Sequence, residues 1–188
     1  MAMRCISLYQ PWASLIACGA KIYETRHWAP PRELIGATIA IHAAKKVDRS
    51  AIPFAEELLY GQHDPGGVTL ADQLAATMRN TPAHLLGMFG MASYPVGCVV
   101  CTARLDGAFL LGDPAEGTAF PAARVISRMT SHAMPACFTV RYDTFGNYAP
   151  GRWAWLLRDV QPLTPPVAAL GRQGFFDLPQ GWMTSTAH

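Results

Sequence analysis

The sequence predicts an α+β fold, in which a small curved β-sheet or barrel carries a helical insertion. Two observations lead to this prediction. Strand-like segments lie toward both ends of the 188-residue chain, and helix-like segments and loops lie between them. Hydrophobic residues make up 51% of the chain and charged residues 15%, a composition typical of a folded domain with a core. We therefore expect residues 1–188 to form a single domain.

The chain begins with a predicted strand, a short helix and a second strand. Residues 4–9 are strand-like, and Pro11 suits the first turn of a helix. Apolar side chains then recur at the spacing of one helix face, and Gly19 is a fitting end for that helix. The second strand is predicted over residues 22–28. A glycine turn therefore joins the helix to this strand.

The next part of the chain is predicted to leave the sheet. A third strand is expected over residues 36–43, and Lys45 and Lys46 follow it in a loop. The character of the sequence then changes over about 47–93, where two helix-like stretches lie on either side of an HDPGG loop. We predict that this segment is a helical insertion.

The C-terminal half is predicted to return to strands. β-Branched residues indicate a strand over 97–106, and shorter strands are expected over 139–141 and 152–159. Residues 114–128 are punctuated by Gly and Pro, so we expect an irregular connection there. Strands from both ends of the chain would thus frame the insertion.

Composition and missing motifs exclude several classes of function. The net charge of +2 and the lack of Lys and Arg runs argue against a general polyanion binder, so any nucleic-acid binding should be local, in one cleft. The sequence has no Walker loop and no GxGxxG motif, which argues against nucleoside triphosphate chemistry. The first apolar run is too short for a signal peptide, and no stretch approaches the roughly 18 apolar residues of a membrane helix. We therefore expect a soluble, cytoplasmic monomer with no membrane partner.

The five cysteines are expected to be reduced thiols in a cytosolic core, because their number is odd and they lie in apolar sequence. Cys98 and Cys101 form a CxxC motif, but it lies in a predicted strand, where residues three apart point to opposite faces. No second CxxC or HxxxH motif supplies further ligands. We therefore predict no metal and no cofactor.

Lys21, Glu24 and Arg26 are the first candidates for a functional site. On a strand, Glu24 and Arg26 share a face, while Lys21 lies at the turn where the helix ends. Trp12 and Gln10 lie close by in the sequence. An aromatic face beside a cation and an acceptor is what a nucleobase pocket needs. A surface ion pair, worth about 0–1 kcal/mol, is the alternative interpretation.

Three further residues are candidates for ligand contact. His42 is a single histidine on an otherwise apolar strand, and a hydrogen-bonded core residue is the alternative. Lys45 follows in the predicted loop, where it would either contact phosphate or stay solvated. Arg152 lies on a Pro-Gly turn at the start of a strand and is better placed for a ligand than Trp153 and Trp155, which we expect to pack in the core.

Four segments together resemble the ASCH family: SLYQPWASLIACGAKIYETRHW, ATIAIHAAKK, VGCVVCTARL and PGRWAWLLRDVQPL. The QPWA and GxKxxExR elements are the more specific ones, and the match covers most of the chain in outline. The fold of this family is a small β-barrel similar to the PUA domains of RNA-modifying proteins. The resemblance therefore implies a PUA-like barrel with flanking helices and an RNA or nucleoside cleft, with the helix over 11–18 on its rim.

Some smaller ASCH relatives hydrolyse acetylcytidine with a Lys, a Thr and a Glu, in a GxKxxT pattern. Lys21 matches their lysine, but Glu24 stands at the position of their threonine and Thr25 is one position away. This departure argues against deacetylation. Other relatives are nucleases, and no catalytic set of theirs transfers to this chain residue by residue.

The sequence thus predicts a protein that binds RNA or a modified nucleoside beside the GxKxxExR segment. Two alternatives stay open. One is a hydrolase that acts on RNA or a modified nucleoside through Lys21 and Glu24. The other is a protein-interaction module formed by the inserted helices, whose LLGMFGM stretch is apolar and rich in methionine. The expected ligand-contacting residues are Gln10, Trp12, Lys21, Glu24, Arg26, His42, Lys45 and Arg152.

Overall fold

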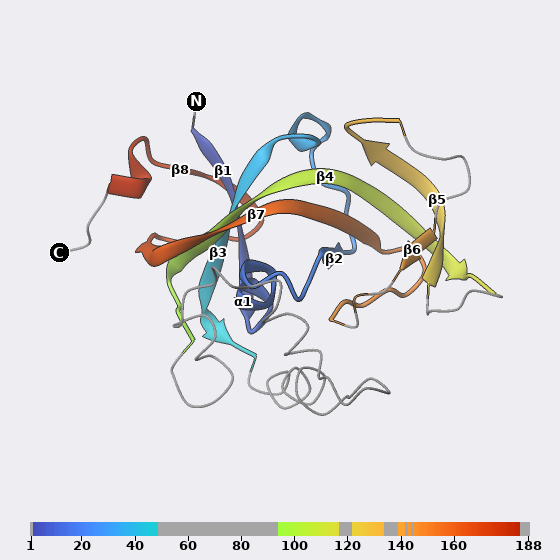
Figure 1. Ribbon diagram of the computed structural model, residues 1–188, viewed down its shortest axis with the longest axis horizontal. Helices are drawn as coiled ribbons and strands as arrows, with labels where there is room; N and C mark the ends of the chain where they lie inside the picture. The colour runs from blue at the N-terminus through green and yellow to red at the C-terminus, as the bar shows by residue number, and fades with distance from the viewer. Residues whose placement is uncertain are drawn as a thin grey trace, which may run out of the picture. The chain divides into compact units, whose positions relative to one another are not determined.

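The computed structural model describes residues 2–48, 94–116, 122–133, 139–141, 143 and 145–184 (Figure 1). The predicted helical insertion lies outside these residues, except for its first two positions, Val47 and Asp48. Cys137 also lies outside them. None of the helices in the described part of the chain is long and apolar enough to cross a membrane.

The described residues are mostly strand, with one short α-helix, α1 (Trp12–Ala17), and two 3₁₀ turns, η1 (Arg32–Leu34) and η4 (Trp182–Thr184). This composition confirms the strand-rich part of the predicted fold. The strands are β1 (Met3–Gln10), β2 (Tyr23–Arg26), β3 (Thr38–Val47), β4 (Cys98–Pro114), β5 (Ala122–Thr130), β6 (Thr139–Arg141), β7 (Trp153–Ala168) and β8 (Phe175–Leu178).

Hydrogen-bonded neighbours follow the order β2-β7-β4-β3-β1-β8, and β5 joins β4 to β6. The chain forms two compact units. The first unit comprises residues 1–20, 40–102 and 160–188, and the second unit comprises residues 21–39 and 103–159. The long strands β3, β4 and β7 contribute residues to both units. The closure of the sheet into a barrel and the single-domain organisation stay predictions.

The first unit is built around β1. This strand pairs with β3 in parallel, with Ser7 opposite His42, and with β8 in the antiparallel sense, with Met3 opposite Leu178. The helix α1 lies against β1 and buries most of its side chains. The buried core of this unit consists of Cys5, Ala40, Val99, Phe176, Leu178 and Trp182.

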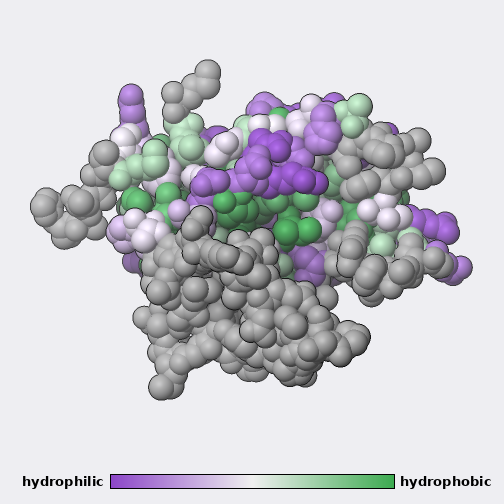
Figure 2. Space-filling view, in the orientation of Figure 1, coloured by the Kyte–Doolittle hydropathy of each residue, from purple (hydrophilic) through white to green (hydrophobic). Residues whose placement is uncertain are grey.

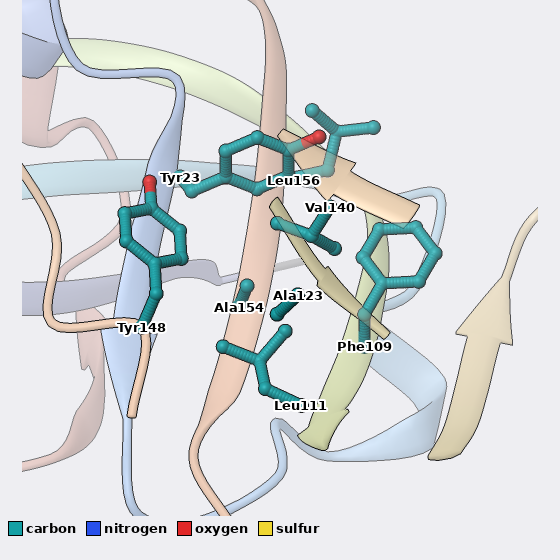
Figure 3. Packing of buried hydrophobic residues seen from close by; sticks show 8 residues of the cluster. All are labelled: Tyr23, Phe109, Leu111, Ala123, Val140, Tyr148, Ala154 and Leu156. Carbon is teal, nitrogen blue, oxygen red and sulfur yellow. The ribbon is translucent and has the colours of Figure 1, made fainter. Parts of the chain in front are cut away.

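The second unit is built around β2 and the strands that follow it. β2 pairs antiparallel with β7, with Tyr23 opposite Leu156, and β5 pairs antiparallel with both β4 and β6. Tyr23 and Tyr148 meet edge to face, with ring centroids 6.2 Å apart. Figure 3 shows the core of this unit, which consists of Tyr23, Phe109, Leu111, Ala123, Val140, Tyr148, Ala154 and Leu156.

Two of the element predictions are wrong. Residues 114–128 were expected to be irregular, but β5 occupies 122–130, because this stretch pairs with β4. Lys45 and Lys46 lie in β3 rather than in a loop, because an irregularity in β1 between Leu8 and Gln10 lets the pairing continue to Val47. Pairing partners distant in the sequence therefore lengthen strands that local composition ends early.

The CxxC cysteines lie in β4, and both are buried and free, as predicted. Burial raises the pKa of Cys98. Burial also raises the pKa of Cys101, and the nearby thiols of Cys18 and Cys5 raise it further. Cys5 shows the same effect, with burial raising its pKa to about 12. These thiols therefore stay protonated at neutral pH and behave as small apolar core residues.

The surface of the described residues mixes apolar and polar side chains. Figure 2 shows one face, on which hydrophobic residues (green) come to the surface beside hydrophilic ones (purple). Single exposed apolar side chains are normal on protein surfaces. The large ones in the described part of the chain are Tyr9, Ile22, Val96, Ile126, Leu170 and Met183.

Candidate functional site

The strand β2 presents Glu24 and Arg26 together, as its alternation predicts. Nε of Arg26 lies 2.8 Å from Oε1 of Glu24. Glu24 is only 8% exposed, whereas Arg26 is half-buried. A carboxylate that is nearly buried needs a cation beside it, and Arg26 supplies that cation. The pair is therefore more shielded than the surface ion pair considered as the alternative.

Lys21 lies at the start of the second unit, two residues after Gly19, whose φ of 81° is the left-handed conformation that favours glycine. The lysine is only 2% exposed, and its Nζ donates a hydrogen bond to the carbonyl oxygen of Phe145 at 3.1 Å. The ammonium group thus has a fixed position inside the second unit.

Asp143 anchors the two segments that surround Lys21. Its Oδ2 accepts hydrogen bonds from the backbone amides of Ile22 and Tyr23, both at 2.9 Å. Its Oδ1 accepts from the amide of Phe145 at 3.0 Å and from the hydroxyl of Tyr148 at 2.6 Å. Burial and the neighbouring Asp143 carboxylate raise the pKa of Tyr148, so this hydroxyl stays a donor. Asp143 was not among the predicted site residues, although its contact to the amide of Phe145, two residues on, is of the local kind that Asp favours.

Arg152 belongs to the same region of the second unit. Its Nη2 donates to the carbonyl of Thr25 at 3.0 Å, and its Nε donates to the carbonyl of Asn147 at 3.1 Å. Thr25 in turn accepts a hydrogen bond from the amide of Asn147 through Oγ1. Arg152 therefore ties β2 to the segment that precedes β7. We call Lys21, Glu24, Arg26, Asp143 and Arg152 the β2 cluster.

Gln10 and Trp12 lie in the first unit. Gln10 is fully buried: its Oε1 accepts from the amide of Ser14 at 3.2 Å, and its Nε2 donates to the carbonyl of Pro95 at 2.7 Å. The glutamine thus connects the first turn of α1 to Pro95, in the segment that precedes β4. Trp12 is half-buried on α1. The expectation that these two share a surface with Lys21 stays a prediction.

His42 and Lys45 lie on β3 in the first unit and differ sharply in environment. His42 is 2% exposed and contacts Ser7 and Ala169 through its two ring nitrogens, as expected of a hydrogen-bonded core histidine. Burial lowers its pKa. Lys45 is exposed, and its stem lies beside Gly97. Only the lysine is placed to meet a phosphate group in solution.

The second unit contains a further charged group that was not predicted from the sequence. Asp106 is 2% exposed and pairs with Arg104 and with Nε of Arg158 at 3.1 Å, while Ser131 donates to its Oδ1 at 3.1 Å. Arg104 also contacts Asp159. These residues come from β4, from β7 and from the bend that follows β5, so no single stretch of the sequence contains them all. Among the described residues, no group of three His, Cys, Asp or Glu side chains is arranged to hold a metal ion.

Comparison with protein families gives a match. The family model of the ASCH domain matches residues 6–107, which span β1 to the middle of β4 and include Lys21, Glu24, Arg26 and His42. No curated protein matches the chain.

Proposed function

This chain belongs to the ASCH domain family, and from this membership and the geometry of the β2 cluster we propose that it binds RNA or a modified nucleoside. The proposal places the ligand at the second-unit residues that carry the GxKxxExR motif. We expect Lys21, Glu24 and Arg26 to contact this ligand.

The balance of charge in the β2 cluster is the observation that carries the proposal. Lys21, Arg26 and Arg152 supply three positive charges, against two negative charges on Glu24 and Asp143, which leaves one net positive charge. Both carboxylate oxygens of Asp143 accept hydrogen bonds, from backbone amides and from a tyrosine hydroxyl. A fixed positive excess favours an anionic ligand, such as the phosphate of a nucleotide.

Arg26 is the residue best suited to direct contact. It is half-buried, and its Nε lies 2.8 Å from the carboxylate of Glu24, with which it forms an ion pair. A guanidinium has a planar arrangement of donors, which suits a base edge or a phosphate better than the ammonium group of a lysine does. The neighbouring Trp28 packs edge to face on Trp155, with ring centroids 4.8 Å apart, so that the segment after β2 is held by aromatic packing.

The hydrolase alternative rests on a different observation, the burial of Lys21 and Glu24. Two nearly buried ionisable groups within one short segment are typical of catalytic sites as well as of structural ion pairs. In this structure Nζ of Lys21 donates to a carbonyl, and Glu24 pairs with Arg26. The protein-interaction alternative concerns residues outside the described part of the chain.

The decisive experiment is a titration with short single-stranded RNA and with a panel of nucleosides. We expect Arg26→Ala to weaken binding by about 1.5–3 kcal/mol, the loss of a charge-assisted hydrogen bond, which is roughly 10- to 150-fold in Kd. Arg26→Lys should recover only part of this loss, because it restores the charge but not the fork. Arg32→Ala is the matched control, since Arg32 is an exposed arginine in η1 of the same unit.

Circular dichroism of each variant shows whether it has folded. A folded Arg26→Ala variant that binds as tightly as the Arg32→Ala control would refute the proposal. Gel analysis of the RNA after incubation separates the alternatives: cleavage that disappears in Lys21→Ala supports the hydrolase, whereas intact RNA supports binding alone.

A further inference from the structure

Ser7 and His42 form a contact in the first unit that the proposed function does not use. The two residues face each other across the parallel pair of β1 and β3, where Ser7 is the register partner of His42. Oγ of Ser7 lies 3.0 Å from Nδ1 of His42, and Nε2 of His42 lies 3.1 Å from the carbonyl oxygen of Ala169. One ring nitrogen thus meets a hydroxyl, and the other meets a group that only accepts hydrogen bonds.

These contacts determine which nitrogen carries the proton. A carbonyl oxygen cannot donate, so Nε2 must be protonated to make its hydrogen bond. Burial lowers the pKa of His42 and therefore favours the neutral ring. In a neutral ring with Nε2 protonated, Nδ1 carries the lone pair, and the Ser7 hydroxyl donates to it. The hydroxyl proton of Ser7 is thus directed at a base.

The ring of His42 is also held from its other sides. Phe176 meets it edge to face, with ring centroids 6.0 Å apart. Gly171 passes directly over the pair: a Cβ at this glycine would lie 2.3 Å from Cε1 of His42 and 2.9 Å from Oγ of Ser7. Only glycine allows the backbone to pass so close. Gly171 is exposed and Ser7 is half-buried, so the pair lies beneath an exposed backbone segment of the first unit.

We propose that Ser7 is a nucleophile and His42 its general base, and that the pair takes an acyl group from a carboxylic ester. A serine hydrogen-bonded to a histidine whose far nitrogen is oriented by a third group is the arrangement that activates a hydroxyl. Here the carbonyl of Ala169 is the orienting group. The site lies entirely within the first unit and shares no residue with the β2 cluster.

The reaction balances with water as the only co-reactant. Oγ of Ser7 attacks the ester carbonyl carbon while Nδ1 of His42 takes the hydroxyl proton. The C–O bond to the alcohol then breaks, and the alkoxide leaves with that proton, which gives an acyl-serine. Water attacks the acyl carbon, its proton passes through Nδ1 to Oγ of Ser7, and the carboxylic acid is released.

A second serine in the chain also lies close to a histidine, and it shows whether closeness alone makes a serine reactive. Oγ of Ser131 lies 3.2 Å from Nδ1 of His132, and both residues are exposed. The Ser131 hydroxyl, however, is within hydrogen-bonding distance of two acceptors of Asp106, its Oδ1 at 3.1 Å and its carbonyl oxygen at 3.3 Å. Its proton is therefore directed at Asp106, and we expect Ser131 to be unreactive.

The test is labelling of the full-length protein with a fluorophosphonate probe, followed by peptide mapping. Oγ attacks phosphorus, fluoride leaves, and the histidine takes the proton, so the probe reports the same nucleophile. We expect adduct on Ser7, no adduct in Ser7→Ala, and unchanged labelling in Ser131→Ala. His42→Gln should slow labelling by about 100-fold or more, the contribution of a general base.

A wild-type protein in which Ser7 is modified no faster than Ser131 overturns the proposal. So does a folded His42→Gln variant that is labelled at the wild-type rate. If His42→Gln does not fold, the ratio of Ser7 to Ser131 labelling in the wild type decides the question alone. Release of p-nitrophenol from p-nitrophenyl acetate, lost in Ser7→Ala, then shows whether the acyl group also turns over; acylation that stalls at Ser7 limits the proposal to acyl transfer and refutes hydrolysis.

Discussion

The β2 cluster of the second unit and the Ser7–His42 pair of the first unit both hold polar side chains in nearly buried places, but they do so in opposite ways. The β2 cluster keeps its charges and neutralises most of them with each other and with backbone groups. The Ser7–His42 pair avoids charge, because burial favours the neutral imidazole. The first arrangement suits recognition of an anion, and the second suits movement of a proton. Experiments that separate charge from proton transfer therefore separate the two sites.

The largest expected effect comes from Asp143, whose hydrogen bonds connect the segments of the β2 cluster. Asp143→Ala removes the acceptor of four hydrogen bonds, from the amides of Ile22, Tyr23 and Phe145 and from the hydroxyl of Tyr148. Bonds to a charged group contribute about 1.5–3 kcal/mol each and are not additive, so we expect a loss of about 3 kcal/mol or more in the free energy of unfolding. Urea denaturation measures it.

The control for this variant is Asp113→Ala, at an exposed carboxylate of β4 in the same unit. Exposed positions away from such contacts usually change stability by about 0.5 kcal/mol or less. Equal midpoints and slopes for the two variants would mean that Asp143 does not hold the β2 cluster in place.

An intermediate effect is expected at Trp12, which tests whether the first unit also contributes to ligand binding. If Trp12 stacks on a base, Trp12→Ala weakens RNA binding by about 1–3 kcal/mol, with little dependence on salt. Lys45→Ala is the comparison: the loss of one phosphate contact weakens binding only slightly and reduces the slope of log K against log salt by about one unit. Titrations at two salt concentrations distinguish them. Identical salt dependence in the two variants would contradict this division of roles.

The smallest effect is expected from a change of pH, which acts on the free energy of unfolding through His42 of the Ser7–His42 pair. The pKa of His42 is lower in the folded state than in the unfolded state, so the unfolded chain binds more protons below a pH of about 6.5. The stabilisation is complete above that pH and declines as the pH falls toward the folded pKa, by at most about 1.4 kcal/mol per pH unit. Unfolding at pH 7.5 and 5.0 should show this slope in the wild type and a flatter one in His42→Gln. Parallel slopes would place the pH dependence elsewhere.

The sequence predicted those parts of both sites that depend on local periodicity. Glu24 and Arg26 are two apart on a strand, and the period of two alone places them together. His42 is conspicuous as a polar residue on an apolar strand, and its burial follows from that pattern. In each case the informative neighbours are a few residues away in the chain.

The remaining parts depend on register, which a single sequence does not contain. Ser7 meets His42 only because β1 and β3 pair in parallel at that alignment. Asp143 accepts from the amides of Ile22 and Tyr23 although it lies 121 positions after Ile22 in the chain. Lys45 and Lys46 fall within β3 because their pairing partner continues past an irregularity in β1. Local composition indicates none of these long-range alignments.

The pairing of β1 with β8 has a consequence for how the protein is made. The ion pair between Arg4 and Asp177 joins residues 173 positions apart, so β1 emerges from the ribosome long before its partner exists. Closing so long a loop costs entropy before any contact forms, and until then the apolar face of β1 stays uncovered. The stretch that the ASCH family model matches, residues 6–107, ends before β7 and β8 and so does not include the strand that pairs with the start of β1. The first unit is completed only when nearly the whole chain has been synthesised, and a growing chain exposes Cys5 and Ile6 to chaperones and aggregation during that time.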